Sequence, residues 1–103
     1  MSVADFITRA EALQARGALA MFSSELNTLR EEVAAGSTAF RARLAADRAA
    51  GQTARSCPPP EGTASTTSEE VLRHMRTYPS TRRSGVNVRT AIWDMMLRKY
   101  PCR

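Results

Sequence analysis

Two cysteines and one histidine are the side chains of this 103-residue sequence with the clearest capacity for chemistry. Cys57 opens the run Cys57-Pro58-Pro59-Pro60, and Cys102 follows Tyr100-Pro101 at the other end of the second half. Such a pair either forms a disulfide in an oxidising compartment or remains as two free thiols in a reducing one. A bridge between them would contribute roughly 4 kcal/mol of stability on the chain-entropy estimate. The state of the two sulfur atoms therefore indicates the compartment.

Metal binding or catalysis at these residues would need further ligands or catalytic groups that the sequence does not supply. The cysteines and His74 supply at most three zinc ligands, and neither cysteine stands in a CxxC pair. A nucleophilic cysteine or serine needs a histidine base, but His74 is expected on the surface of a short helix. The carboxylates fall on predicted exposed helix faces: Glu11, Glu25, Glu31 and Glu32. We therefore expect no enzyme, no bound metal and no cofactor.

The basic charge balance bears on the partner. Lys and Arg number 15 against 10 Asp and Glu, which gives a net charge of +5. The arginines are scattered and mixed with acids, as in Arg30-Glu31-Glu32, and only Arg82-Arg83 stand side by side. This pattern argues against nucleic acid as the partner, because binding arms normally carry blocks of like charge. It favours an acidic protein, an anionic lipid or a wall polymer.

Apolar runs are short throughout the sequence. The longest is Ala18-Leu19-Ala20-Met21-Phe22, whereas a transmembrane helix needs about 20 apolar residues. We expect no transmembrane segment. The first residues, Met1 to Asp5, also lack the basic start and apolar stretch of a signal peptide, so an exported protein is expected to have lost one before this numbering begins.

Helical periodicity fills residues 1–50. Ser2 is a predicted N-cap, with Asp5 three residues later, and Gly17 ends the first helix. Ser23 or Ser24 caps a second helix that we expect to run to about Ala50 and to end at Gly51. The predicted buried positions are Val3, Phe6, Ile7, Ala10 and Leu13, then Leu26, Leu29, Val33, Phe40 and Leu44. Gly36 falls inside the second stripe and marks a bend, a close crossing or a break that would produce a helical hairpin.

Residues 51–66 are a predicted Pro-, Ser- and Thr-rich connector, in which Cys57 to Pro60 form a stiff extended strut. Thr66 or Thr67 caps a third helix that ends at Tyr78-Pro79, and Asn87 caps a last helix that ends before Pro101. The buried positions are Val71, Leu72, Met75, Val88, Ala91, Ile92, Met95 and Met96. The prediction is one all-α domain, residues 1–103: a small bundle of about four helices with N-terminal helices in 1–50 and a helix pair in 67–103.

The loop from Ser80 to Val86 is the predicted contact surface. It is polar, basic and held between two helices, which is where binding residues commonly lie. The candidate partner-binding residues are Thr81, Arg82, Arg83 and Arg76. Tyr78 and Trp93 are secondary candidates that we expect to pack in the core.

The second half resembles the C-terminal signature of the Rap/Tai immunity proteins. The matching features are Cys57-Pro58-Pro59-Pro60-Glu61-Gly62-Thr63, a helix followed by Tyr78-Pro79, and the closing Tyr100-Pro101-Cys102. The resemblance covers about residues 56–102. The cysteine pair that the family commonly carries in its N-terminal part has no counterpart in residues 1–50.

The resemblance implies an exported, periplasmic, all-helical protein with a Cys57–Cys102 disulfide. It also implies a protein partner of the peptidoglycan amidase class, delivered by type VI secretion and blocked by binding, and often a homodimer. Two other classes stay open at this point: a structural or stress-related protein of the cell envelope, and a cytoplasmic basic helical adaptor or nucleic-acid binder.

Overall fold

A computed structural model describes residues 1–60, 62–63 and 66–102 of the chain. The described residues form six helical segments: α1 (Val3–Ala15), η1 (Gly17–Phe22), α2 (Ser24–Ala49), α3 (Ser68–Met75), η2 (Arg83–Gly85) and α4 (Val88–Lys99). They include no β-strand, only an isolated antiparallel bridge between Ser2 and Asn87. The predicted all-α class is confirmed.

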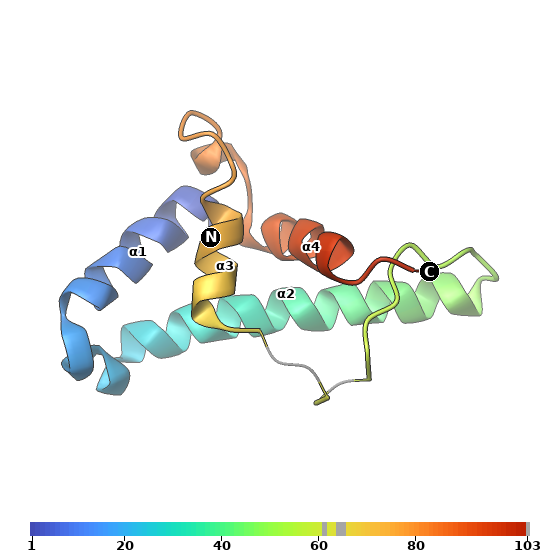
Figure 1. Cartoon of the computed structure of the whole chain (residues 1–103), viewed down its shortest axis with the longest axis horizontal. Coiled ribbons are helices and arrows are strands. Elements are labelled where there is room, and N and C mark those ends of the chain that lie inside the picture. Colours follow the sequence, from blue (N-terminus) through green and yellow to red (C-terminus); the bar gives the residue numbers. More distant parts are fainter. Residues whose placement is uncertain (61, 64–65, 103) are drawn as a thin grey trace.

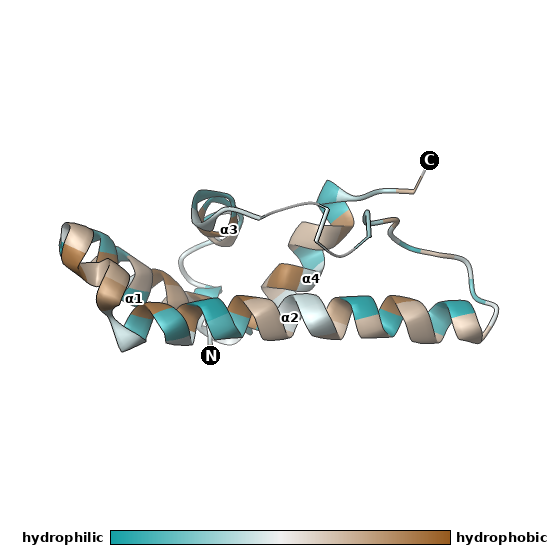
Figure 2. Ribbon diagram, turned by 90° about the horizontal axis from the view of Figure 1, so that it is seen from below, coloured by the Kyte–Doolittle hydropathy of each residue, from teal (hydrophilic) through white to brown (hydrophobic). Residues whose placement is uncertain are grey.

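Helix α2 is the base of the molecule. It runs along most of the longest dimension of a body that measures 47 × 32 × 20 Å (Figure 1). Helices α3 and α4 lie on one side of α2 in both views (Figure 1, Figure 2). Helix α1 lies at an angle to α2 and is joined to the N-terminal end of α2 through η1 (Figure 1). The connector after α2 doubles back over the C-terminal half of this helix, which brings Ser56 and Cys57 to the end of α4 (Figure 1).

The predicted caps explain where the helices begin. Side-chain oxygens accept backbone N–H groups at all four α-helices: Ser2 from Asp5, Ser23 from Glu25, Thr67 from Glu70 and Asn87 from Arg89. Ser23 rather than Ser24 is therefore the cap of α2. Helix α3 ends at Met75, three residues before the predicted stop at Tyr78, because Arg76 and the two residues after it form turns.

Helix α2 continues through Gly36 without a break, so the hairpin alternative is not adopted. Gly36 is buried where α4 crosses, and a Cβ atom there would lie 3.0 Å from the Cβ of Ile92. One turn further along, Phe40 packs edge-on against Trp93 of α4, with ring centroids 4.9 Å apart. The glycine therefore marks the close crossing.

One hydrophobic cluster joins all the α-helices. Every predicted buried position of α1, α3 and α4 lies in it, and Leu29, Phe40 and Leu44 represent α2. Leu26 and Val33 are only partly buried, as are Tyr78 and Trp93. The N-terminus closes one side of this core, because Val3 N–H donates to the Val86 carbonyl (2.8 Å) and Val88 N–H to the Met1 carbonyl (2.9 Å).

Candidate functional site

Cys57 and Cys102 are joined by a disulfide, with their Cα atoms 4.9 Å apart. The predicted pairing is therefore confirmed in the structure, and the free-thiol alternative is not adopted. Both cysteines are solvent-exposed. The bond ties the start of the proline strut (residues 57–60) to the residues that follow α4, although the two cysteines are 45 positions apart in sequence.

Hydrogen bonds to a single carbonyl reinforce this attachment. The Tyr100 carbonyl accepts from the Cys57 N–H (2.9 Å) and from the Ser56 hydroxyl (2.8 Å). Ser56 is a polar residue with only 3% of its surface exposed, so its hydroxyl needs this partner. A carbonyl beyond the end of α4 is thereby satisfied, and the strut begins in a fixed position.

The far end of the strut is fastened to α2. The guanidinium of Arg41 donates from Nη1 to the Pro59 carbonyl at 3.1 Å. A proline run has no N–H donors inside it, so its carbonyls depend on donors from elsewhere. The disulfide and Arg41 together hold the strut across the C-terminal half of α2.

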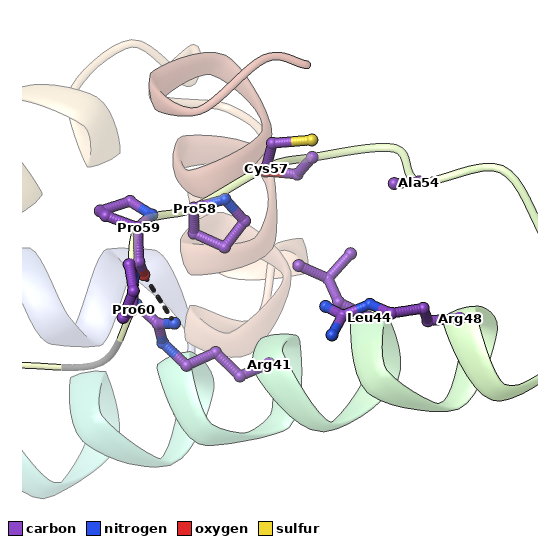
Figure 3. A pocket seen from close by; sticks show the side chains of 9 residues that line it. Arg41, Leu44, Arg48, Ala54, Cys57, Pro58, Pro59 and Pro60 are labelled. Atoms are coloured by element: carbon purple, nitrogen blue, oxygen red, sulfur yellow. Dashed lines mark hydrogen bonds between the residues drawn. The ribbon is translucent and has the colours of Figure 1, made fainter.

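An arginine-lined cleft of about 480 Å³ lies between the strut and α2 (Figure 3). Arg41 and Arg48 contribute the positive charge, and Leu44 lies between them on the same helix. The opposite wall is made of Ala54, Ser56, Cys57, Pro58, Pro59 and Pro60. We call the space that these residues line the arginine cleft.

The charge of the arginine cleft is available to a ligand. The Arg48 guanidinium makes no hydrogen bond or ion pair with the described residues, and Arg41 uses one nitrogen for Pro59. The nearby acid Asp47 is already bound by Arg43 at 3.1 Å and is largely buried. A guanidinium fork beside a leucine suits a carboxylate that is flanked by apolar groups.

The structure places the four predicted contact residues in different surroundings. Thr81 and Arg82 are exposed, as expected of a binding loop. Arg83 turns inward, where its Nε donates to the Tyr78 carbonyl (2.9 Å) and its Nη2 to the Arg76 carbonyl (3.0 Å). The Arg76 side chain lies 3.7 Å from Glu11 of α1. Arg83 therefore fastens the loop to the end of α3. The role of all four residues in partner binding stays a prediction.

His74 is half-buried rather than fully exposed, which differs from the expectation. Its Nε2 lies 3.2 Å from the Tyr78 hydroxyl, and that hydroxyl donates to Asp94 of α4 at 2.6 Å. Burial, and then the positive charge of Arg98, lower the pKa of His74, whereas burial and the Asp94 carboxylate raise the pKa of Tyr78. These side chains link the end of α3 to α4.

The described part of the chain places no group of three or more His, Cys, Asp or Glu side chains where they could hold a metal ion. None of its helices combines the length and hydrophobicity that a membrane span requires. Comparisons with models of protein families, with curated proteins and with solved structures find no match to this chain.

The arginine cleft is not among the sites predicted from the sequence, although the sequence contains one signal for it. Arg41, Leu44 and Arg48 are spaced three and four residues apart, which places all three on one face of a helix. That face becomes a site only because the strut returns across it, and the return depends on a disulfide between distant residues. Periodicity alone could not show it.

Proposed function

We propose that this protein is an exported, disulfide-stabilised helical binding protein that holds an acidic segment of a partner protein in the arginine cleft. The observation that carries the proposal is the double fastening of the strut, by the disulfide to the end of α4 and by Arg41 to α2. A cleft that is fixed before binding loses little conformational entropy when the partner arrives. Disulfides persist mainly in oxidising compartments, which supports export.

The resemblance of residues 56–102 to Rap/Tai immunity proteins supports the periplasm as the compartment and a peptidoglycan amidase effector as the partner. A protein that blocks an enzyme needs a rigid complementary surface and no reacting groups of its own. Occlusion by this protein requires an acidic patch near the substrate entrance of the amidase, because the arginine cleft presents Arg48 and part of Arg41.

The test is a binding and inhibition assay between the purified oxidised protein and a type VI amidase effector from the same genome. We expect tight binding and loss of peptidoglycan hydrolysis. Arg48→Glu should weaken binding at least tenfold, about 1.4 kcal/mol. Arg82→Glu is the matched control, because it makes the same change of charge on an exposed loop away from the cleft.

Each alternative predicts a different result. Loss of binding in Arg82→Glu but not in Arg48→Glu would move the contact surface to the loop at 80–86. Failure of the oxidised protein to bind any amidase would favour the structural or stress-related envelope class.

A further inference from the structure

An apolar tip, defined as Leu19, Met21 and Phe22 of η1, is a feature that the proposed function does not use. The exposed fractions of these residues are 77%, 66% and 91%. The segment Gly17–Phe22 contains no polar side chain at all. Contiguous exposure of large hydrophobic side chains on a small protein usually marks a contact with a partner or a membrane.

The apolar tip protrudes from one end of the molecule. It occupies the corner between α1 and α2, at the end of the long dimension (Figure 1). Ala20, in the middle of the segment, is buried in the core and holds η1 in place. The tip is therefore an exposed apolar group that is anchored at one end of the molecule.

The charge around the apolar tip is positive. Residues 15–24 include one charged side chain, Arg16, and it is exposed. The two nearest acids in sequence are Glu11 and Glu25. Each lies within ion-pair distance of an arginine: Glu25 with Arg9 at 3.5 Å and Glu11 with Arg76 at 3.7 Å. No unpaired carboxylate in this part of the described chain opposes an anionic surface.

Shape and chemistry favour a lipid surface over a protein. A stable protein interface buries about 800 Å² on each partner with a polar rim that forms hydrogen bonds, and three apolar side chains at one corner of the molecule do not provide this. A bilayer interface accepts small apolar projections and rewards flanking cations that meet phosphate groups. The tip has both properties.

We propose that the apolar tip inserts shallowly and reversibly into the interface of a bilayer that contains anionic phospholipid. Phe22, Met21 and Leu19 enter the boundary between headgroups and acyl chains, and Arg16 contacts headgroup phosphates. The arginine cleft begins 19 residues after Phe22 along α2, so the helical rise carries it roughly 30–40 Å from the tip. The cleft therefore stays open to a protein partner while the tip is inserted.

The test is co-sedimentation with vesicles of phosphatidylcholine alone or with about 30% phosphatidylglycerol. We expect binding to the anionic vesicles and little to the neutral ones. A triple variant, Leu19→Ser with Met21→Ser and Phe22→Ser, should bind at least tenfold more weakly. Arg16→Gln should weaken binding about fivefold. The matched control Arg55→Gln, with the same net charge and exposed in the connector after α2, should weaken it less than about twofold.

Phe22→Trp supplies a direct probe, since Trp93 is half-buried and packs against Phe40, about five helical turns along α2 from Phe22. Its emission should shift to the blue when anionic vesicles are added, with no shift in the unsubstituted protein. The proposal is overturned if the unsubstituted protein does not sediment with anionic vesicles, or if the triple variant sediments equally well. It is also overturned if a photoreactive phenylalanine analogue at position 22 attaches to a protein and not to lipid.

Discussion

Gly36 of α2 lies so close to Ile92 of α4 that a methyl group at position 36 would be 3.0 Å from the Ile92 Cβ and 3.1 Å from its Cγ1. This contact sets the spacing of the two helices that share the largest interface in the fold. It also places Phe40 edge-on against Trp93 one turn later. The helix that carries the arginine cleft is thereby fixed to the helix whose end carries Cys102.

Gly36→Ala tests this crossing. Alanine should favour the helix by about 1 kcal/mol, but overpacking against Ile92 should cost about 1–3 kcal/mol. We expect a net loss of about 1 kcal/mol in urea unfolding. Ala45→Gly, on the exposed face of α2, measures the propensity term separately. If Gly36→Ala raises the free energy of unfolding by as much as Ala45→Gly lowers it, the close contact with Ile92 is contradicted.

Two neighbouring arginines should behave differently when each is replaced by alanine. Arg83→Ala removes hydrogen bonds to the Tyr78 and Arg76 carbonyls and should lower the unfolding free energy by about 1–2 kcal/mol. Arg82 is exposed, so Arg82→Ala should change it by less than about 0.5 kcal/mol. Thermal unfolding of the pair checks this difference. Equal values for the two variants would remove the structural role given to Arg83.

The lowered pKa of His74 predicts a dependence of stability on pH. Burial and Arg98 disfavour the charged imidazole, so the unfolded chain binds a proton at a higher pH than the folded protein. Stability should therefore fall as the pH drops from 6.5 towards the folded pKa and then level off. An NMR titration of the imidazole should give a pKa below 6.5. The variant His74→Gln should lose this part of the slope, and an unchanged slope would assign it to other groups.

The disulfide should supply a large part of the folding free energy. It closes a loop between residues 45 positions apart, for which chain entropy predicts a stabilisation of roughly 4 kcal/mol. Urea unfolding with and without a reductant measures this loss. The double variant Cys57→Ser with Cys102→Ser should match the reduced protein, and its insensitivity to reductant is the control. A loss below about 1 kcal/mol would mean that the strut holds its place without the bond.

Local sequence signals predicted most of the fold. The helix starts could be predicted from the caps Ser2, Ser23, Thr67 and Asn87. Each cap oxygen accepts from an N–H group only two or three residues later, so the interaction depends on local sequence alone. The spacing of the apolar residues predicted the buried faces of the helices, because helical periodicity fixes which residues share a side. The third helix ends at Met75 rather than at the predicted Tyr78, because the N–H groups of Thr77 and Tyr78 donate to carbonyls three residues earlier instead of continuing the α-helix.

Features that depend on distant contacts were harder to predict. Arg82 and Arg83 have the same local character, and only the hydrogen bonds of Arg83 to the Tyr78 and Arg76 carbonyls, just after α3, separate them. The run from Ala18 to Phe22 falls between the first two predicted helices, and its apolar character did not indicate that Ala20 is buried while Leu19, Met21 and Phe22 are exposed. The arginine cleft needed the path of the strut, which no local pattern encodes.

In the compartment where the protein acts, an oxidised Cys57–Cys102 pair should hold the arginine cleft in place. The most direct test is to alkylate intact cells that make the protein, isolate it and determine its mass. We predict no alkyl group on the isolated protein, and two after reduction and a second alkylation. Two alkyl groups without prior reduction would show free thiols in the cell, which would contradict both the export and the covalently fixed cleft.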